Sequence, residues 1–90
     1  MKPVRWTTHA LREIARREID RAEAELALQQ PDAVLPVPPA RSFYQRRYLD
    51  KTLGETMLLR VLVEETAAER VLVTLYKTSK FKKYEGGQSR

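Results

Sequence analysis

The chain carries a single histidine, His9, and no cysteine. Imidazole is the side chain whose ordinary pKa lies near neutrality, so general acid or base chemistry at pH 7 points first to His9. This residue lies at the start of a predicted helix, where the positive end of the helix dipole disfavours the imidazolium. A surface or packing histidine is the alternative interpretation. The composition excludes disulfides, thiolate zinc sites, cysteine nucleophiles and two-histidine metal sites, so neither a metal nor another cofactor is expected.

Arg60 lies in the middle of a predicted strand that otherwise consists of Met, Leu and Val. Because a buried guanidinium without a partner is costly, we expect Arg60 on a partly open sheet face, near an acid or a phosphate. Three side chains of neighbouring strands could share that face: Arg46, Tyr48 and Tyr76. Arginine and tyrosine together offer bidentate phosphate binding and a surface on which bases stack. The alternative is a cross-strand ion pair of Arg60 with Glu64 or Glu69.

The last predicted strand and the residues after it interleave lysines with aromatic residues, from Tyr76 to Tyr84. The lysines are Lys77, Lys80, Lys82 and Lys83. Flexible cations neutralise phosphates, and aromatic rings stack on unpaired bases. The whole net charge of +5 falls in residues 41–90, with eleven basic and six acidic residues, whereas residues 1–40 carry six of each. Such clustering is typical of a polyanion binder. A solvated tail that keeps the protein in solution is the alternative.

Two helices are predicted in the first third of the chain, over residues 8–17 and 20–29. Apolar residues three or four positions apart form one stripe along them: Leu11, Ile14, Ala15, Ile19, Ala22 and Leu26. Thr7 or Thr8 can cap the first helix. Asp20 followed by Glu23 has the spacing of a capping box, which favours a second helix start and a break near Glu18 over one long helix.

Three strands are predicted after the helices, over residues 42–49, 56–64 and 70–79, where side chains alternate and turns intervene. The proline-rich connector 31–39 leaves room for at most a short edge strand. An antiparallel meander with one face covered by the helices is the economical arrangement. The expected fold class is therefore α+β, with two N-terminal helices packed on one face of a small, three- to four-stranded antiparallel sheet.

Ninety residues suit one domain. We expect residues 1–90 to form it, with an N-terminal extension over 1–6 and a basic, partly flexible tail over 81–90. No apolar run is long enough for a bilayer and no signal-peptide pattern opens the chain, so we expect a cytoplasmic protein without a membrane partner. The oligomeric state stays open, because edge strands could pair with another chain.

Several short motifs follow one another between residues 7 and 84. They are His9-Ala10-Leu11, Arg17 with Ile19-Asp20, Pro31-Asp32, Arg60-Val61 and Val73-Thr74-Leu75-Tyr76-Lys77-Thr78-Ser79-Lys80. This layout is similar to a bacterial family of small domains of unknown function, which itself resembles the RelE/ParE-like toxin superfamily that includes the BrnT toxins. The last strand is the most specific part. Two positions depart from the family pattern, since Glu13 stands where the family has an arginine and Glu18 where it has a glycine.

The resemblance implies a RelE-like domain and a metal-independent ribonuclease, or a toxin directed at the ribosome or gyrase, which a partner antitoxin neutralises. RNA supplies its own nucleophile, the 2′-hydroxyl, so such an enzyme needs a base, cations for the phosphorane and an acid. The implied catalytic residues are His9, Arg60, Tyr76 and Lys80. The implied nucleic-acid-binding residues are Arg17, Arg46, Lys77, Lys82, Lys83 and Tyr84. His9 or Lys80 is expected as the base, Arg60 and Arg17 as charge stabilisers, and Tyr76 as a stacking or proton-donating group.

Two other functions remain open at this point. One is a non-catalytic module that binds nucleic acid or protein, and the other is a folded but inactive remnant of a mobile element. The loss of the family arginine at position 13 and of the glycine at position 18 bears on this choice, because either change could remove activity.

Overall fold

Two nine-residue helices form within the predicted ranges, in a computed structural model that describes residues 2–85. The predicted stripe is not the buried face, because Leu11, Ala15 and Ala22 are exposed while Ala10, Ala24, Ala27 and Leu28 are buried. Helix α1 spans Thr8–Arg16 and helix α2 spans Arg21–Gln29. The Oγ1 atom of Thr7 accepts a hydrogen bond from the Ala10 amide, and the Asp20 carboxylate accepts one from the Ala22 amide. Between the helices, Glu18 adopts a left-handed conformation with φ 54°. The predicted break near Glu18 is confirmed.

The strands form one five-stranded mixed sheet in the order β1-β5-β4-β3-β2. Their bounds are β1 Val4–Trp6, β2 Ala33–Val37, β3 Arg41–Asp50, β4 Glu55–Glu65 and β5 Arg70–Thr78. Strands β2 to β5 pair antiparallel with their neighbours, whereas β1 pairs parallel with β5. The three strands expected from the alternation are confirmed as β3, β4 and β5.

The expected fold class is wrong. The sheet has five strands and is mixed rather than antiparallel with three or four, and a third helix, α3 (Phe81–Tyr84), follows β5. Strand β1 has three residues, too few for an alternation pattern, and it forms because the β5 backbone offers it hydrogen-bonding partners. Residues 81–85, expected in a flexible tail, contain α3 and its C-cap. Residues 1 and 86–90 lie outside the described part of the chain.

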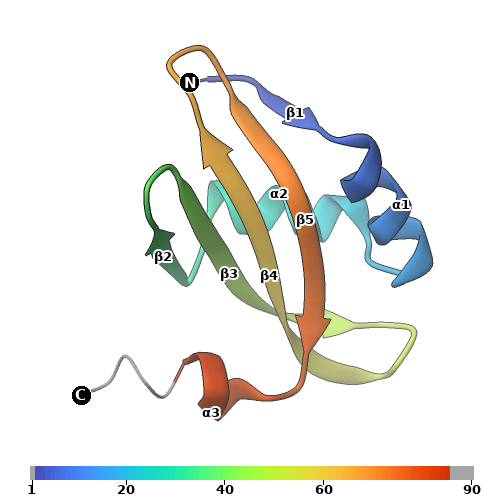
Figure 1. Cartoon of the computed structure of the whole chain (residues 1–90). Coiled ribbons are helices and arrows are strands. Elements are labelled where there is room, and N and C mark those ends of the chain that lie inside the picture. Colours follow the sequence, from blue (N-terminus) through green and yellow to red (C-terminus); the bar gives the residue numbers. More distant parts are fainter. Residues whose placement is uncertain (1, 86–90) are drawn as a thin grey trace.

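Helices α1 and α2 cover one face of the sheet, which we call the helical face. In Figure 1 helix α2 crosses behind the strands, while α1 follows β1 along the β5 edge. The core lies between this face and the helices, and its central strand contributes Met57, Leu59, Val61 and Val63. Ala24, Ala27 and Leu28 of α2 pack against it. No helix among residues 2–85 is long and apolar enough to cross a membrane.

The opposite face of the sheet carries α3, and we call it the α3 face. Side chains alternate along each strand, so the register places Gln45, Arg60 and Tyr76 side by side on this face, on β3, β4 and β5. Helix α3 contacts the same face, because the Tyr84 ring lies over the Arg60 guanidinium. The α3 face therefore carries a polar and aromatic cluster around Arg60, whereas the core residues of the same strands point to the helical face.

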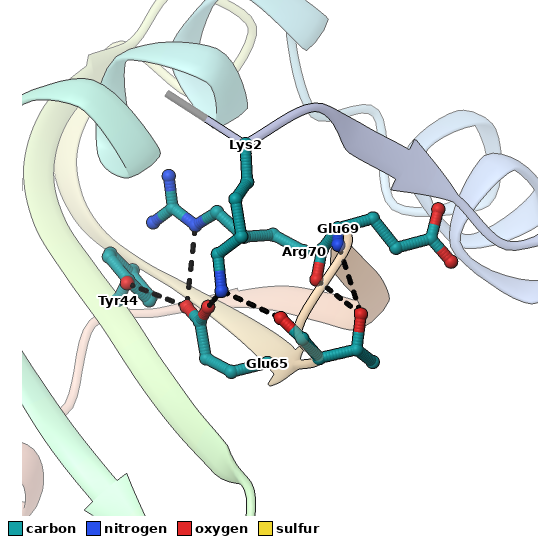
Figure 2. A network of polar contacts seen from close by, with 6 residues as sticks. Lys2, Tyr44, Glu65, Glu69 and Arg70 are labelled. Atoms are coloured by element: carbon teal, nitrogen blue, oxygen red, sulfur yellow. Dashed lines mark hydrogen bonds and ion pairs between the residues drawn. The ribbon is translucent and has the colours of Figure 1, made fainter.

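A network of polar contacts joins the N-terminus to the β4–β5 hairpin (Figure 2). Lys2 Nζ lies 2.8 Å from a Glu65 carboxylate oxygen and donates to the Thr66 carbonyl. The Glu65 carboxylate also accepts from the Tyr44 hydroxyl and pairs with Arg70. These contacts attach the segment that precedes β1 to the β4–β5 hairpin, and they hold β1 in place beside β5.

Candidate nucleic-acid interface

Arg60 is the centre of a hydrogen-bonded and aromatic cluster on the α3 face. Its side chain is nearly buried, since the residue is 7% exposed. Nε donates to Gln45 Oε1 at 2.9 Å, and Nη1 donates to the Tyr76 hydroxyl at 2.6 Å. The guanidinium lies between two rings, 4.0 Å from the Phe43 centroid and 4.1 Å from the Tyr84 centroid. We call these five residues the Arg60 cluster.

The Arg60 cluster contains no carboxylate that could neutralise the charge of Arg60. Among residues 2–85, none of the ion pairs includes Arg60, and its hydrogen-bond partners are a neutral amide and a hydroxyl. The alternative of an ion pair with Glu64 or Glu69 is wrong, because Glu64 pairs with Arg41 and Glu69 with Arg5. Aromatic faces attract a cation, and this attraction holds the guanidinium in a nearly buried place.

The two tyrosines of the cluster have their pKa values moved in opposite directions. Burial raises the pKa of Tyr76, and the hydrogen bond that Tyr76 donates to Tyr84 raises it further, against the lowering effect of the Arg60 guanidinium. The hydrogen bond with Tyr76, followed by one with Lys83, lowers the pKa of Tyr84. Tyr84 is thus the hydroxyl of the cluster that loses its proton more readily.

Arg46 and Tyr48 do not share this face, contrary to expectation. Arg46 pairs with Leu59 and therefore lies on the helical face, where its Nη1 donates to the Gln30 carbonyl at 2.7 Å, at the end of α2. Tyr48 lies on the same side and donates to Asp50. Arg46 thus binds the C-terminal end of a helix, a favourable place for a cation.

Arg17 and Lys77 are also engaged away from the Arg60 cluster. The Arg17 guanidinium pairs with Glu13, which lies nearly buried on α1 and pairs with Arg16 as well. Lys77 Nζ pairs with Asp50 at 2.6 Å and donates to the Glu18 carbonyl. These contacts connect helices and strands of the helical side.

His9 and Lys80 lie in exposed places that do not touch Arg60. His9 Nε2 is 3.1 Å from Thr74 Oγ1, at the β5 edge of the sheet. Thr74 precedes Tyr76 by two positions on the α3 face, so His9 stands at the margin of that face. Lys80 precedes α3, and Lys82 and Lys83 are exposed on it. The structure thus brings together Arg60, Tyr76 and Tyr84, with the three lysines beside them.

Three residues of this face were missed by sequence reasoning: Phe43, Gln45 and Arg47. Their alternation was visible, but only the strand register shows that Gln45 faces Arg60. Gln45 is 1% exposed and also donates from Nε2 to the Tyr84 carbonyl. Arg47 lies next along β3, over the Phe81 ring at 4.3 Å, and pairs with Glu85 at 2.6 Å.

Two surface grooves lie on opposite sides of the molecule. A groove of about 250 Å³ on the α3 side is lined by Arg47, Phe81, Lys82 and Glu85. A larger groove of about 400 Å³ lies between the α1–α2 corner and the β3–β4 turn, and its carboxylates are Glu18, Asp20, Glu23 and Asp50. Arg47 and Lys82 are the cations of the first groove, whereas carboxylates predominate in the second.

No protein-family model, curated protein or solved structure matches the chain. The resemblance to the RelE/ParE-like toxins therefore stays a prediction from the sequence motifs.

Proposed function

We propose that the protein binds single-stranded RNA on the α3 face, with Arg60 at the centre of the phosphate site. The observation that carries the proposal is a nearly buried guanidinium without a carboxylate partner among residues 2–85. Burying a charge without an opposite charge beside it is costly, and a bound phosphate would supply that opposite charge to Arg60. From the sequence we expect the protein in the cytoplasm, and RNA occurs in that compartment.

The surroundings of Arg60 support RNA rather than a small anion. Rings of Tyr84 and Phe81 lie on this side for stacking with unpaired bases, and the exposed lysines Lys82 and Lys83 extend the positive charge beyond the Arg60 site. A single phosphate would not need this extent of charge. An extended polyanion with unpaired bases uses both features.

Cleavage of the bound RNA is a second function, favoured by one observation. The Tyr84 hydroxyl has a lowered pKa and is hydrogen-bonded to Tyr76, beside a cation that could stabilise a phosphorane. Tyr84 would then take the 2′-hydroxyl proton in place of His9 or Lys80, which do not contact Arg60, and Tyr76 would give a proton to the leaving 5′-oxygen. A protein that cleaves RNA in this way would be the toxin-type enzyme expected from the sequence. The proposal then includes a partner antitoxin that neutralises it.

The binding test measures fluorescence anisotropy with a labelled single-stranded 2′-O-methyl RNA, which has no free 2′-hydroxyl. We expect Arg60→Gln to weaken binding by about tenfold. Arg21→Gln is the matched control, since it removes the same charge from α2 on the other side, where Arg21 is exposed and pairs with Glu25. Lys83→Gln removes the charge of an exposed residue. We expect the slope of log K against the logarithm of the salt concentration to become shallower by about 0.7.

Equal affinity of wild type, Arg60→Gln and Lys83→Gln would overturn the proposal, and so would equal losses in Arg60→Gln and Arg21→Gln. Circular dichroism of each variant confirms that it folds. Unmodified RNA incubated with the wild type then tests cleavage. Products ending in a 2′,3′-cyclic phosphate, absent with Tyr84→Phe, are expected for the enzymatic form, and intact RNA leaves binding without cleavage.

A further inference from the structure

The Glu85 carboxylate occupies an anion site of its own on the α3 face. Arg47 Nε lies 3.2 and 3.1 Å from the two carboxylate oxygens of Glu85, and Nη2 lies 2.6 Å from Oε1. This is the two-oxygen geometry with which a guanidinium also binds a phosphate. The Arg47 guanidinium lies over the Phe81 ring, 4.3 Å from its centroid, and Lys82 lines the same groove.

The Arg47 site is adjacent to the Arg60 cluster. Gln45 pairs with Arg60 across the strands, and Arg47 follows Gln45 by two residues on the same face, roughly 7 Å further along β3. A chain of phosphates lying across the face would thus meet two guanidinium groups in succession. One has no carboxylate partner among residues 2–85, and the other holds Glu85.

Helix α3 covers both positions. Tyr84 lies over the Arg60 guanidinium, its carbonyl accepts from Gln45 at 3.4 Å, and Glu85 pairs with Arg47. Helix α3 has only four residues, and an exposed ion pair contributes little to stability, so these contacts hold it weakly. The Arg47 side chain is 52% exposed, so its pair with Glu85 is open to exchange with another anion.

We infer that Arg47, Phe81 and Lys82 form a second nucleotide subsite, in which the Glu85 carboxylate takes the place of a phosphate. The inference rests on the proposed function. An RNA phosphate replaces Glu85 on Arg47 when Tyr84 and Glu85, at the C-terminal end of α3, move away while Phe81 and Lys82 stay in place, and the same movement uncovers Arg60. The C-terminal helix is therefore a built-in competitor, and RNA affinity depends on the strength of the Arg47–Glu85 pair.

The test is a double-mutant cycle on the affinity for single-stranded 2′-O-methyl RNA. Glu85→Gln frees Arg47, and we expect tighter binding by about two- to fivefold. In an Arg47→Gln background the same change has no competitor to remove, so the gain disappears. Glu25→Gln is the matched control, because Glu25 is an exposed glutamate that pairs with Arg21 on α2. It changes the net charge equally and should alter affinity little in both backgrounds, since distant charges are screened.

A gain for Glu85→Gln that equals the gain for Glu25→Gln, or that persists in the Arg47→Gln background, would overturn the inference alone while Arg60-dependent binding stands. Absence of binding in the wild type and in Glu85→Gln alike would overturn the proposed function and the inference together. Binding by Glu85→Gln without binding by the wild type would support the inference, because the competitor then dominates.

Discussion

At the scale of single residues, the cations of this protein divide by what neutralises them. On the helical side each cation discussed above has a structural partner: Arg17 has Glu13, Lys77 has Asp50, and Arg46 has the end of α2. Arg60 is instead held by rings and neutral hydrogen-bonding groups. This absence of a carboxylate partner among residues 2–85 is the observation on which the proposed phosphate site rests.

Glu13 is the residue whose titration should be visible in stability. Its hydrogen bonds with Arg16 and then Arg17 lower its pKa from the ordinary 4.5 to about 2. Because the folded state lowers this pKa, the stabilisation is fully present above pH 4.5 and is lost as the pH falls towards 2. We expect Glu13→Gln to unfold at lower urea concentration than the wild type at pH 7, with the difference shrinking as the pH falls through this range.

Urea denaturation followed by circular dichroism at several pH values measures this difference. Glu25→Gln is the control, because its exposed pair with Arg21 should change the free energy of unfolding by no more than about 0.5 kcal/mol. A Glu13→Gln difference that stays constant from pH 7 to pH 2 would mean that the two arginines do not lower the pKa of this carboxyl.

At the scale of elements, the corner between α1 and α2 positions the helical layer. The chain turns at Glu18, whose backbone is left-handed, and Lys77 donates to the Glu18 carbonyl from β5. The Asp20 cap then starts α2, which crosses the sheet over β3 and β4. Glycine adopts the left-handed conformation without the steric cost that a side chain adds, so this corner favours glycine over glutamate.

Replacing Glu18 with glycine should therefore stabilise the protein. Side chains other than glycine pay for the left-handed region, at roughly 1–2 kcal/mol, part of which returns as chain entropy of the unfolded state. We expect Glu18→Gly to raise the free energy of unfolding by about 1 kcal/mol in urea denaturation. The same change in the middle of a helix, Glu25→Gly, should lower it by about 1 kcal/mol. Destabilisation by both changes would argue against the left-handed corner.

At the scale of the whole molecule, the two ends of the described chain act on opposite faces. Strand β1 adds to the sheet beside β5 (Figure 1). Its residues Val4 and Trp6 pack against the core. Helix α3 lies on the other face, over the Arg60 cluster. The N-terminal segment therefore packs against the core, while the C-terminal segment covers the proposed RNA site.

Trp6 provides a test of the contribution of β1. Its ring packs against the core and lies under the Arg21 guanidinium at 4.6 Å. We expect Trp6→Ala to lower the free energy of unfolding by about 2–3 kcal/mol, slightly below the loss for a fully buried tryptophan. Leu11→Ala, at an exposed leucine of α1, should cost no more than about 0.5 kcal/mol. Equal effects in urea denaturation would mean that β1 detaches readily from the sheet.

Several helices and strands could be predicted from the sequence, because patterns among neighbouring residues indicate them. The apolar stripe and the Asp20 cap placed both helices, and alternation placed β3, β4 and β5, because both patterns depend on neighbouring residues. The sequence also singled out Arg60 and Tyr76, since an arginine among aliphatic residues is conspicuous within one strand.

Features that depend on contacts between distant segments of the chain could be seen only in the tertiary structure. Strand β1 exists through hydrogen bonds to residues more than sixty positions away, and the register between β3 and β4 puts Gln45 rather than Arg46 beside Arg60. A shift of one residue reverses which face every side chain of a strand occupies, and no local pattern specifies that choice. For the same reason the contact of Glu85 with Arg47, which covers the proposed second subsite, could not be seen in the sequence.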